Sequence, residues 1–406
     1  MTPHPARVLY VVSLFPCWSE TFIVREIEQL TARGVDVRIL SLKAPSESLV
    51  HAQAAALMPR VRHARPLRAS IGARLRHALA NLPAVSAAVA EAVAGLWRTP
   101  GALAKTLASQ FRALGELDEV REFAPQWIHA HWATYPSTAA MFLSRLTGVP
   151  WSFTAHAHDI FVEQQLLPRK LSRAALAVTI SRFNVGWLRP YARAGSAPLK
   201  VVHCGVDPDE LPFEPGDRDA ATVLAIGRLD PIKGFDVLLH AFARVVAGGA
   251  RGRLRIVGEG PERARLEALR HELGLDAQVD FVGAQPQPAI RRALREATVF
   301  ALPSMVAPDG NRDGIPVALM EAMAAGAPVV TTAVSGIPEL VDDGREGDVV
   351  APGDAEALAA ALRRQLDDPA LRRRYAQAAR AKIEREFDTR AESARLLEHF
   401  GACLNA

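Results

Sequence analysis

The sequence has few cysteines and no long apolar run, and both absences narrow the classes of protein that it can form. The three cysteines, Cys17, Cys204 and Cys403, are widely spread over 406 residues, which argues against a disulfide framework and against a cysteine metal site. No uninterrupted apolar run is long enough to cross a bilayer. Because a strand-like segment begins as early as Arg7, we expect no signal peptide and a cytoplasmic protein.

The chain also lacks a strong excess of charge. Its formal net charge is +4 and its pI is near 9.1, which is too mild to indicate nucleic acid as a partner. The charge is uneven, however: from Arg60 to Arg112 there are eight arginines and one lysine against a single acid. Ile71, Leu75 and Leu79 would share one helix face here, with arginines off it. Such a helix can lie on an anionic membrane surface, although a helix covering a sheet with its charges in water explains the pattern equally well.

Apolar runs alternate with helical patterns along the whole chain, which is typical of parallel α/β sheets. The strand-like segments are 7–13, 35–42, 127–131, 151–155, 177–180 and 200–203, then, after a proline-rich linker at 204–216, 222–226, 254–257, 279–283, 299–303 and 328–332. We therefore predict an α/β fold of two doubly wound, Rossmann-like domains facing a cleft. The expected domains are 1–205 and 206–385, followed by a C-terminal helix at 386–406 that is a candidate to cross back to the first domain. The last sixty residues are expected to form two surface helices.

A loop and helix at 309–326 provide the clearest ligand signal. Pro316 suits a first helical position and Gly326 suits the stop. A helix entered in this way presents backbone N–H groups without partners and a partial positive charge, which favour phosphate. Asp313 and Glu321 frame this anion site and could hold sugar hydroxyls. The plainer interpretation is an ordinary amphipathic helix with a solvated acid at each end.

A second loop, at 227–234, supports an anion site in the same half of the chain. Arg228 and Lys233 flank a turn that opens a helix, and this combination suits a diphosphate. Two surface cations near a loop are the simpler alternative. A glycine-rich segment begins at Gly258, but Arg263 stands where a dinucleotide motif needs its third glycine, so we do not expect a nicotinamide site.

Four histidines lie at the ligand-binding edge of the first domain, at 129, 131, 156 and 158. The repeated His-x-His spacing suggests zinc, but no acidic or cysteine ligand completes a set at suitable spacing, so we expect no metal. We interpret His156 as a hydrogen-bonding group in the cleft, and Asp159 as its neighbour or as the cap of the following helix. His129 and His131 also fit a core position, which we favour for His129.

Motifs in the second half resemble the donor half of the family 4 glycosyltransferases. They are Gly227-Arg228-x4-Lys233-Gly234, Val257-Gly-x-Gly-Pro261, Asp313-Gly-Ile-Pro-x4-Glu321-Ala-Met-x2-Gly326 and Gly336-Ile-Pro-Glu-Leu340. The first half is similar, more loosely, to the branch that builds bacterial exopolysaccharides such as colanic acid and capsule repeat units. The residues that carry this likeness are Phe15-Pro-x2-Ser19-Glu20-Thr21-Phe22-Ile23, His129-Ala-His131-Trp132 and Thr154-Ala-His156-x2-Asp159-Ile160.

The resemblance implies a GT-B architecture and a retaining, metal-independent hexosyl transfer. The donor would be a UDP-, GDP- or ADP-sugar, the acceptor a saccharide or a polyprenyl-linked saccharide, and no further cofactor is expected. Separately from the resemblance, the basic stretch Arg60–Arg112 is the candidate contact for peripheral attachment at the inner face of the cytoplasmic membrane.

The resemblance also implies roles for individual residues. On the donor side these are Arg228 and Lys233 for the diphosphate, Glu321 for the ribose, and Asp313 with Gly314, Ile315, Pro316 and Val317 for sugar and phosphate. The choice of base depends on the loop backbone around Gly260, Val282 and Leu302. His156 would lie by the reacting carbon, so His156, Asp313 and Glu321 are the expected catalytic residues. The acceptor side would contain Ser19, Glu20, His131 and Asp159. The family usually has Glu where this chain has Asp313, which makes the role of Asp313 the least secure.

Other activities fit the same architecture. An epimerase would turn over the nucleotide sugar without an acceptor, and a phosphorylase would need phosphate and no nucleotide. A non-catalytic partner in a polysaccharide assembly complex would bind the donor and never consume it.

Overall fold

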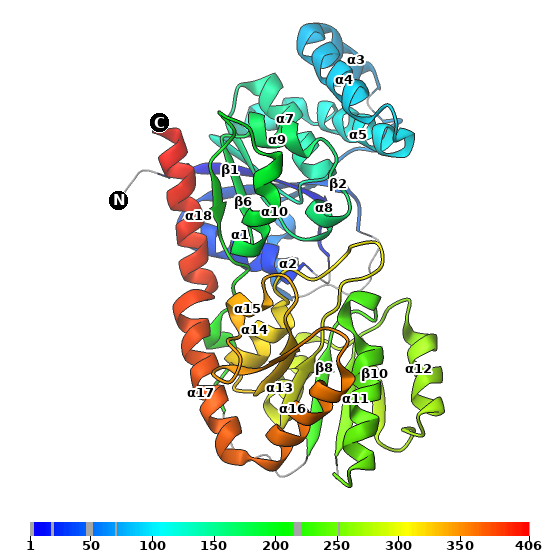
Figure 1. Cartoon of the computed structure of the whole chain (residues 1–406). Coiled ribbons are helices and arrows are strands. Elements are labelled where there is room, and N and C mark those ends of the chain that lie inside the picture. Colours follow the sequence, from blue (N-terminus) through cyan, green and yellow to red (C-terminus); the bar gives the residue numbers. More distant parts are fainter. Residues whose placement is uncertain are drawn as a thin grey trace. The chain divides into compact units, whose positions relative to one another are not determined.

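The computed structural model describes residues 4–17, 20–45, 52–69, 71–214, 221–250 and 252–405, so Ser19, one of the expected acceptor-side residues, lies outside the described part. The chain divides into two compact units (Figure 1). Unit 1 comprises Met1–His203 and Glu392–Ala406, and unit 2 comprises Cys204–Ala391. The expected C-terminal segment, 386–406, is thus shared between the two units.

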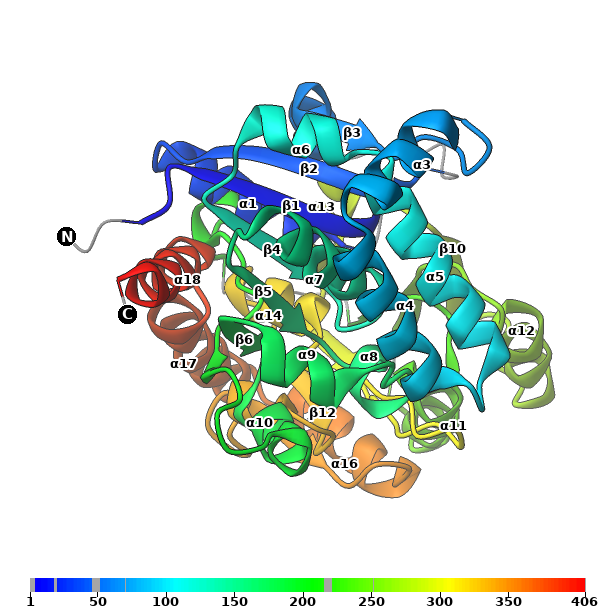
Figure 2. The same cartoon turned by 90° about the horizontal axis from the view of Figure 1, so that it is seen from above.

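Unit 1 is built on a seven-stranded parallel sheet in the order β3-β2-β1-β4-β5-β6-β7. Figure 2 shows β3 to β6 following one another across this sheet. The strands are β1 (Arg7–Leu14), β2 (Asp36–Lys43), β3 (Val61–His63), β4 (Trp127–His131), β5 (Trp151–Ala155), β6 (Leu176–Thr179) and β7 (Leu199–Val201).

Helices cover both faces of this sheet, because its strands are apolar on both sides. They are α1 (Thr21–Ala32), α2 (Ala52–Leu57), α3 (Ile71–Ala80), α4 (Leu82–Leu96), α5 (Pro100–Leu114), α6 (Leu117–Phe123), α7 (Tyr135–Thr147), α8 (His158–Phe161), α9 (Leu167–Arg173) and α10 (Arg182–Leu188). The last helix, α18 (Thr389–Leu404), also packs in this unit. Its Phe400 stacks on Trp127, with ring centroids 5.0 Å apart.

Unit 2 has a six-stranded parallel sheet in the order β10-β9-β8-β11-β12-β13. Its strands are β8 (Thr222–Ile226), β9 (Arg253–Val257), β10 (Val279–Gly283), β11 (Val299–Leu302), β12 (Val329–Thr332) and β13 (Gly347–Val350). Its helices are α11 (Phe235–Ala247), α12 (Arg263–Glu272), α13 (Gln287–Glu296), α14 (Val317–Ala324), α15 (Ile337–Leu340), α16 (Ala355–Asp367) and α17 (Pro369–Glu386).

Both sheets reverse their strand order at one place. The first strand of each unit is flanked by the second strand on one side and the fourth on the other, so the reversal lies between β1 and β4 in unit 1 and between β8 and β11 in unit 2. Doubly wound sheets bind ligands beyond the carboxyl ends of the strands at this switch point. The predicted α/β, doubly wound architecture is therefore confirmed, and it defines where each site should lie.

The end of the chain differs from the expectation of two surface helices. Three helices form instead, α16, α17 and α18. The break between the first two has a clear local cause, since the side chain of Asp368 caps α17 by accepting a hydrogen bond from the Leu371 amide at 2.9 Å, and Pro369 suits the first turn. Tyr375 and Ile383 are buried, so α17 contributes to the core rather than only covering it.

Candidate functional site

The loops that follow β8 and β11 meet at the switch point of unit 2. Lys233 ends a short turn after β8, and Gly234 follows with a φ of 63°, in the left-handed region. A Cβ at Gly234 would lie 2.1 Å from the backbone oxygen of Pro303, so glycine is required. The Met305 amide donates to the backbone oxygen of Ile232 at 2.8 Å. This close packing brings Lys233 next to the residues that follow β11.

Lys233 and Asp313 form an ion pair in this position. The Lys233 Nζ donates to Oδ1 of Asp313 at 2.7 Å, and the Ser304 hydroxyl donates to Oδ2 at 2.8 Å. The two charged side chains are 16% and 11% exposed, so solvent screens their attraction less than that of a surface pair. Arg228, the other expected diphosphate cation, is exposed on the same loop as Lys233.

Helix α14 begins directly after this loop. Pro316 has φ −66° and ψ 126° and is the N-cap, so the helix starts at Val317, one residue later than the sequence suggested. The amides of Leu319 and Met320 bond to the Pro316 oxygen, and the amides before them are the ones that a helix start leaves without an intrahelical partner. The helix ends at Ala324 with Ala325 as its C-cap, and Gly326 follows with a φ of 78°, as expected of the residue after a helix.

The other expected donor-site residues lie at the same edge of the sheet. Gly260 follows β9 in such close contact that a Cβ there would lie 2.3 Å from the backbone oxygen of Leu229. Val282 is on β10, residues 314–317 connect the Asp313 loop with α14, and Glu321 is buried on α14 itself. The structure thus brings Lys233 and Asp313 into contact and places the other residues in neighbouring segments. Their roles in binding stay predictions.

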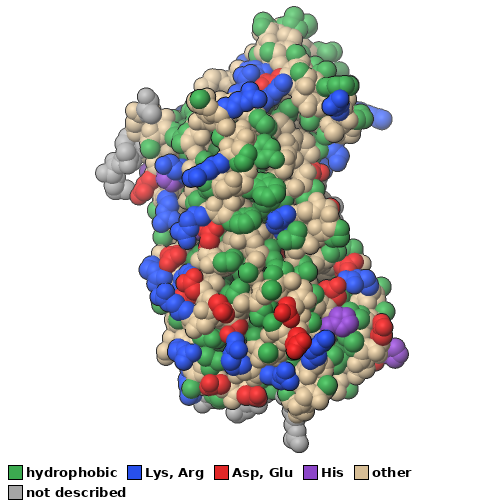
Figure 3. Space-filling view, in the orientation of Figure 1, with side chains coloured by type: hydrophobic (Ala, Val, Ile, Leu, Met, Phe, Trp, Pro, Cys, Tyr) green, Lys and Arg blue, Asp and Glu red, His purple; other side chains and the backbone are tan. Residues whose placement is uncertain are grey.

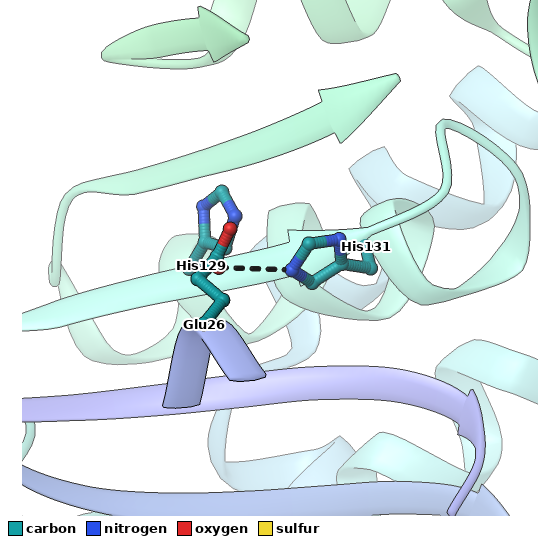
Figure 4. Close-up of side chains that lie close together, drawn as sticks. All are labelled: Glu26, His129 and His131. Carbon is teal, nitrogen blue, oxygen red and sulfur yellow. Dashed lines mark hydrogen bonds and ion pairs between the residues drawn. The ribbon is translucent and has the colours of Figure 1, made fainter. Parts of the chain in front are cut away.

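At the switch point of unit 1, the side chains of Glu26, His129 and His131 lie together (Figure 4). Glu26 comes from α1 and the histidines from β4. The His131 Nε2 lies 3.0 Å from Oε1 of Glu26, and the Tyr10 hydroxyl donates to the same oxygen at 2.6 Å. His129 belongs to a separate set of bonds, since its Nδ1 lies 2.7 Å from the Ser152 hydroxyl. His129 is therefore buried in the core, the position that we favoured.

This cluster also has the composition of a metal site. The ligand atoms of Glu26, His129 and His131 all lie within 4.8 Å of one another. The expectation that no acid completes the histidine pair was therefore wrong, because Glu26 reaches it from another element. Each of these ligand atoms already has a protein partner, including Thr154, whose hydroxyl lies 3.1 Å from the His129 Nε2. We therefore interpret the cluster as a hydrogen-bond network, and a reaction without metal stays a prediction.

His156 extends the network beyond β5. Its Nε2 lies 3.1 Å from Nδ1 of His131, and its ring contacts those of Phe22 and Trp132, with centroids 4.8 and 4.5 Å away. The Trp132 indole N–H donates to the Glu20 carboxylate at 3.0 Å. The expected acceptor-side residues His131 and Glu20 are thus both linked to His156, although His131 itself is buried.

The proton positions in this network depend on one another. Burial acts to raise the pKa of Glu26, but attraction to His131 and His129 and the hydrogen bonds from His131 and Tyr10 together outweigh it and hold this pKa below its ordinary value. An ionised Glu26 only accepts, so His131 must donate through Nε2. When His131 is neutral, its Nδ1 accepts from His156 Nε2–H, and the Nδ1 of His156 is left as an acceptor. When His131 is protonated, His156 Nε2 accepts instead and its Nδ1 becomes a donor.

Burial keeps two of these histidines uncharged. It lowers the pKa of His129 to about 3, with the nearby His131 adding to the effect. Burial also lowers the pKa of His156 well below its ordinary value, and the neighbouring histidines reinforce this. His156 can therefore offer a hydrogen bond or accept one, but it does not supply a positive charge.

Two buried ionisable residues, Asp159 and Lys170, support this arrangement. Oδ2 of Asp159 accepts from the Ala133 amide at 2.6 Å, Oδ1 accepts from the His156 amide at 3.0 Å, and the Lys170 Nζ donates to the Ala133 oxygen at 2.7 Å. The loops after β4 and β5 are thereby joined. Asp159 lies inside α8, whose N-cap is Ala157, so the cap hypothesis was wrong and the alternative, a neighbour of His156, is confirmed. Because Asp159 is completely buried, we assign it to positioning rather than to contact with an acceptor.

The sequence analysis included Phe22 in a motif without giving it a role, and it missed Tyr10, Glu26 and Lys170. Phe22 and Glu26 are four residues apart, so they share one face of α1, and both face the histidines. A carboxylate one turn from an aromatic residue, on the helix that follows the first strand, was a usable signal. Lys170 had no such signal, because nothing local distinguishes a buried lysine from the many solvated cations of this chain.

Each half of the chain matches a family of known proteins. A family model described as "Glycosyltransferase Family 4" matches residues 19–210, and one described as "Glycosyl transferases group 1" matches residues 208–382. The amylovoran biosynthesis glycosyltransferase AmsK of Erwinia amylovora is 37% identical over 225 residues, which are 54% of each protein. The match therefore spans about half the length of that relative. A glycogen synthase of Mycobacterium tuberculosis is 31% identical over 293 residues, 68% of each protein.

Solved structures show the same fold over nearly the whole chain. The structure of Anabaena Alr3699/HepE in complex with UDP-glucose has a TM-score of 0.71 at 19% identity and covers 97% of this chain and 99% of that one. At this identity the likeness is one of fold. Together with the two doubly wound sheets, it confirms the predicted GT-B architecture.

We predict that Glu26→Leu lowers the free energy of unfolding by about 3 kcal/mol, because it leaves the buried Tyr10 hydroxyl and His131 Nε2–H without their acceptor. Tyr10→Phe removes only one donor and should cost about 1 kcal/mol. Urea unfolding followed by circular dichroism measures both values. Equal costs for the two variants would show that Glu26 is not the common acceptor of the network.

We also predict that Asp159 makes stability depend on pH. Burial raises the pKa of Asp159 from 3.8 to about 6, so the folded state binds this proton more tightly than the unfolded chain. The free energy of unfolding of the wild type, relative to Asp159→Asn, should therefore fall as pH rises from about 4 to about 6. Urea titrations across this range measure the difference, with the exposed Glu122→Gln as control. A difference that rises with pH would contradict the assignment.

Proposed function

The chain belongs to the group 1 and family 4 glycosyltransferases, and from that premise we propose a retaining transfer of a hexose from a nucleotide diphosphate sugar to a hydroxyl of a saccharide or polyprenyl-linked saccharide. The observation that carries the proposal is the Lys233–Asp313 pair beside the start of α14, at the switch point of unit 2. Support also comes from AmsK, which is named for amylovoran biosynthesis, and from HepE, which was solved with UDP-glucose. We place the reaction in exopolysaccharide or capsule biosynthesis, at the inner face of the cytoplasmic membrane.

The donor loops suit the departure of a nucleoside diphosphate. Breaking the anomeric C–O bond develops negative charge on the diphosphate. Lys233, the exposed Arg228 and the first amides of α14 are groups that can stabilise this charge without a metal ion. We propose that the acceptor hydroxyl attacks from the same face of the sugar, forms the new C–O bond at the anomeric carbon and passes its proton to the leaving diphosphate oxygen.

The carboxylates Asp313 and Glu321 are proposed to hold hydroxyl groups of the donor. Asp313 already uses both oxygens, one for Lys233 and one for Ser304. A carboxylate also has lone pairs for more than two hydrogen bonds, so it can accept from a sugar hydroxyl as well. Asp313 contacts Lys233 directly. Because Asp is one methylene shorter than Glu, the sugar would approach this loop more closely than in relatives with Glu. Glu321, on α14, is proposed to accept from the ribose.

His156 is proposed to act beside the reacting carbon. Because its side chain is uncharged, it can orient a sugar hydroxyl through Nδ1 while the network behind it fixes the ring. Glu26 and His131 are positioning residues in this proposal, since they determine whether Nδ1 of His156 accepts or donates.

We predict that calorimetric titration with UDP-, GDP- and ADP-sugars finds one tightly bound donor, with the same Kd in excess chelator as in magnesium. Lys233→Ala should raise that Kd roughly 10- to 100-fold, because one charge-assisted hydrogen bond is lost. Arg292→Ala, a change of an exposed cation on α13, is the matched control and should leave the Kd unchanged. Donor binding that requires magnesium would overturn the metal-independent mechanism.

We predict that His156→Ala lowers kcat about 100-fold or more while the donor Kd changes little, because the proposed contact is made at the reacting carbon. Steady-state kinetics and calorimetry with the donor found above separate the two quantities. Normal turnover in His156→Ala would remove His156 from the site. A wild-type protein that binds donor and shows no transfer, hydrolysis or epimerisation would instead be the non-catalytic partner.

A further inference from the structure

Helices α3 and α4 carry an exposed apolar surface that the proposed function does not use. Of the twelve large hydrophobic side chains that are exposed in the described residues, eight lie between Leu67 and Trp97. Figure 3 shows hydrophobic side chains over this part of unit 1, at the top of the view. We call this surface the α3–α4 face and define it by Ile71, Leu75, Leu79, Leu82, Val89, Val93 and Trp97. Contiguous exposed apolar patches mark interaction sites.

The face follows from the spacing of apolar residues. They recur every fourth position from Ile71 to Leu79 in α3 and from Val89 to Trp97 along α4 and its cap, so each helix presents one apolar stripe outward. Leu79 is 72% exposed and Trp97 is 64% exposed. A helix that merely covers a core in water carries polar residues on its outer side.

The inner side of α4 is apolar as well. Ala88, Ala92 and Leu96 are buried against the unit. The one charged residue of the helix is Glu91. Its carboxylate forms ion pairs with Arg145 at 2.7 Å and with Arg173 at 2.9 Å. The outward side of α4 therefore carries no charge of its own.

The basic stretch contributes less surface charge than its composition suggests. Arg74 is completely buried, and its guanidinium donates to backbone oxygens that include those of Pro66 and Leu67. Arg60 and Arg62 are also engaged, in ion pairs with acids of the same unit. The attraction to anionic lipid that the sequence suggested would therefore be weaker than a count of arginines implies.

The exposed cations that flank the face nevertheless match a lipid headgroup. Arg68 precedes α3, and Arg98 and Lys105 follow α4. The Arg98 guanidinium lies 5.0 Å from the centroid of the Trp97 ring, so a cation and an indole stand together at the edge of the face. Between residues 71 and 105 the sequence contains one acid, Glu91, which is already neutralised.

A cavity adjoining the face is lined almost wholly by hydrocarbon. It has a volume of about 360 Å³. Gln110 is the one polar residue of its wall, and Val89 belongs both to the wall and to the face. The lining residues are Leu67, Val85, Val89, Leu107, Ala108, Gln110, Phe111, Leu114 and Phe142. Such a wall suits a hydrocarbon chain better than a peptide, whose backbone would need hydrogen-bond partners.

The length and bend of the helices decide between lying on a membrane and crossing it. Among the described residues no single helix is long and apolar enough to cross a bilayer, although α3 and α4 taken together have the length and the apolar composition for it. They meet at 98°, and α3 buries Arg74 and His77 against the unit. Helices joined in this way are suited to lie in the interface rather than to span it.

We propose that the α3–α4 face docks on a lipid bilayer, with its apolar side chains at the boundary of the hydrocarbon and Arg68, Arg98 and Lys105 among the headgroups. The attachment is driven mainly by apolar burial and only secondarily by charge. It is therefore retained on zwitterionic lipid and at high salt. This inference rests on the proposed function for the membrane location and adds the surface and the kind of attachment, and its test needs neither donor nor acceptor.

The test is cosedimentation of the full chain with vesicles of phosphatidylcholine alone and of phosphatidylcholine with phosphatidylglycerol. We expect binding to both, changing less than about threefold between roughly 0.05 and 0.5 M salt, a range over which exposed charges become strongly screened. Leu79→Glu with Trp97→Glu should weaken binding about tenfold or more. Leu404→Glu changes an exposed leucine of the same unit outside the face and should bind as the wild type does.

Brominated lipid chains test insertion directly. They should quench the fluorescence of the wild type, and Trp97→Phe should lose most of that quenching. Binding only to the anionic vesicles with release by salt would overturn the apolar docking, as would no binding to either vesicle. A dimer in the absence of vesicles that Leu79→Glu abolishes would assign the face to a second copy of the chain instead. Unchanged melting curves of the variants would show that the exposed substitutions leave the fold intact.

Discussion

The order of the strands is the constraint on which both candidate sites depend. In each sheet the chain adds strands first on one side of its first strand and then on the other. The carboxyl ends of β1 and β4, and those of β8 and β11, therefore lie side by side, and the loops that follow them start from one place. Residues eighty positions apart, Lys233 and Asp313, meet there because their strands are neighbours. Glycine at 234 is the local condition for this meeting, because any Cβ would strike the backbone that follows β11.

The site of unit 1 meets a different requirement, which is to place polar rings in a dry interior. Each ring nitrogen of His129 and His131 has a hydrogen-bond partner, and burial keeps His129 uncharged. One buried donor left without an acceptor would cost about 1–3 kcal/mol, so the network is tolerated only because it is complete. Arg74, in another part of the unit, is satisfied only in part: its two terminal nitrogens donate to backbone oxygens, including those of Pro66, Leu67 and Arg65, while its buried Nε has no hydrogen-bond partner among the described residues. The result is a rigid support with one uncharged histidine, His156, at its end.

Much of the fold was predictable, because apolar runs and helical periods are local signals. The longer strands and the helix after the first strand appear within a few residues of their expected places. The short strands β3 and β13 were missed, since three or four residues carry too little pattern. The donor-side residues were predictable from motif spacing, because those of each loop, at 227–234 and before α14, lie close together in the sequence. Glu26 and Lys170 were not, since their significance arises only from what lies across the sheet.

Charge was the property that sequence composition described least well. The sequence does not distinguish the arginines between positions 60 and 112 from one another. In the structure, Arg74 is buried, and Arg60 and Arg62 are paired with acids. Arg68 and Arg98 are exposed. What distinguishes them is the acceptors that the fold brings near, and these come from distant segments. The apolar positions of the same helices predict the surface better, because several of them stay exposed in the folded unit. The proposals therefore divide the work by chemistry: unit 2 offers cations and amides to a diphosphate, whereas the outer helices of unit 1 offer hydrocarbon to lipid. An acceptor that is itself attached to a lipid would be held at the membrane surface by such docking, where its free hydroxyl could be presented to the enzyme.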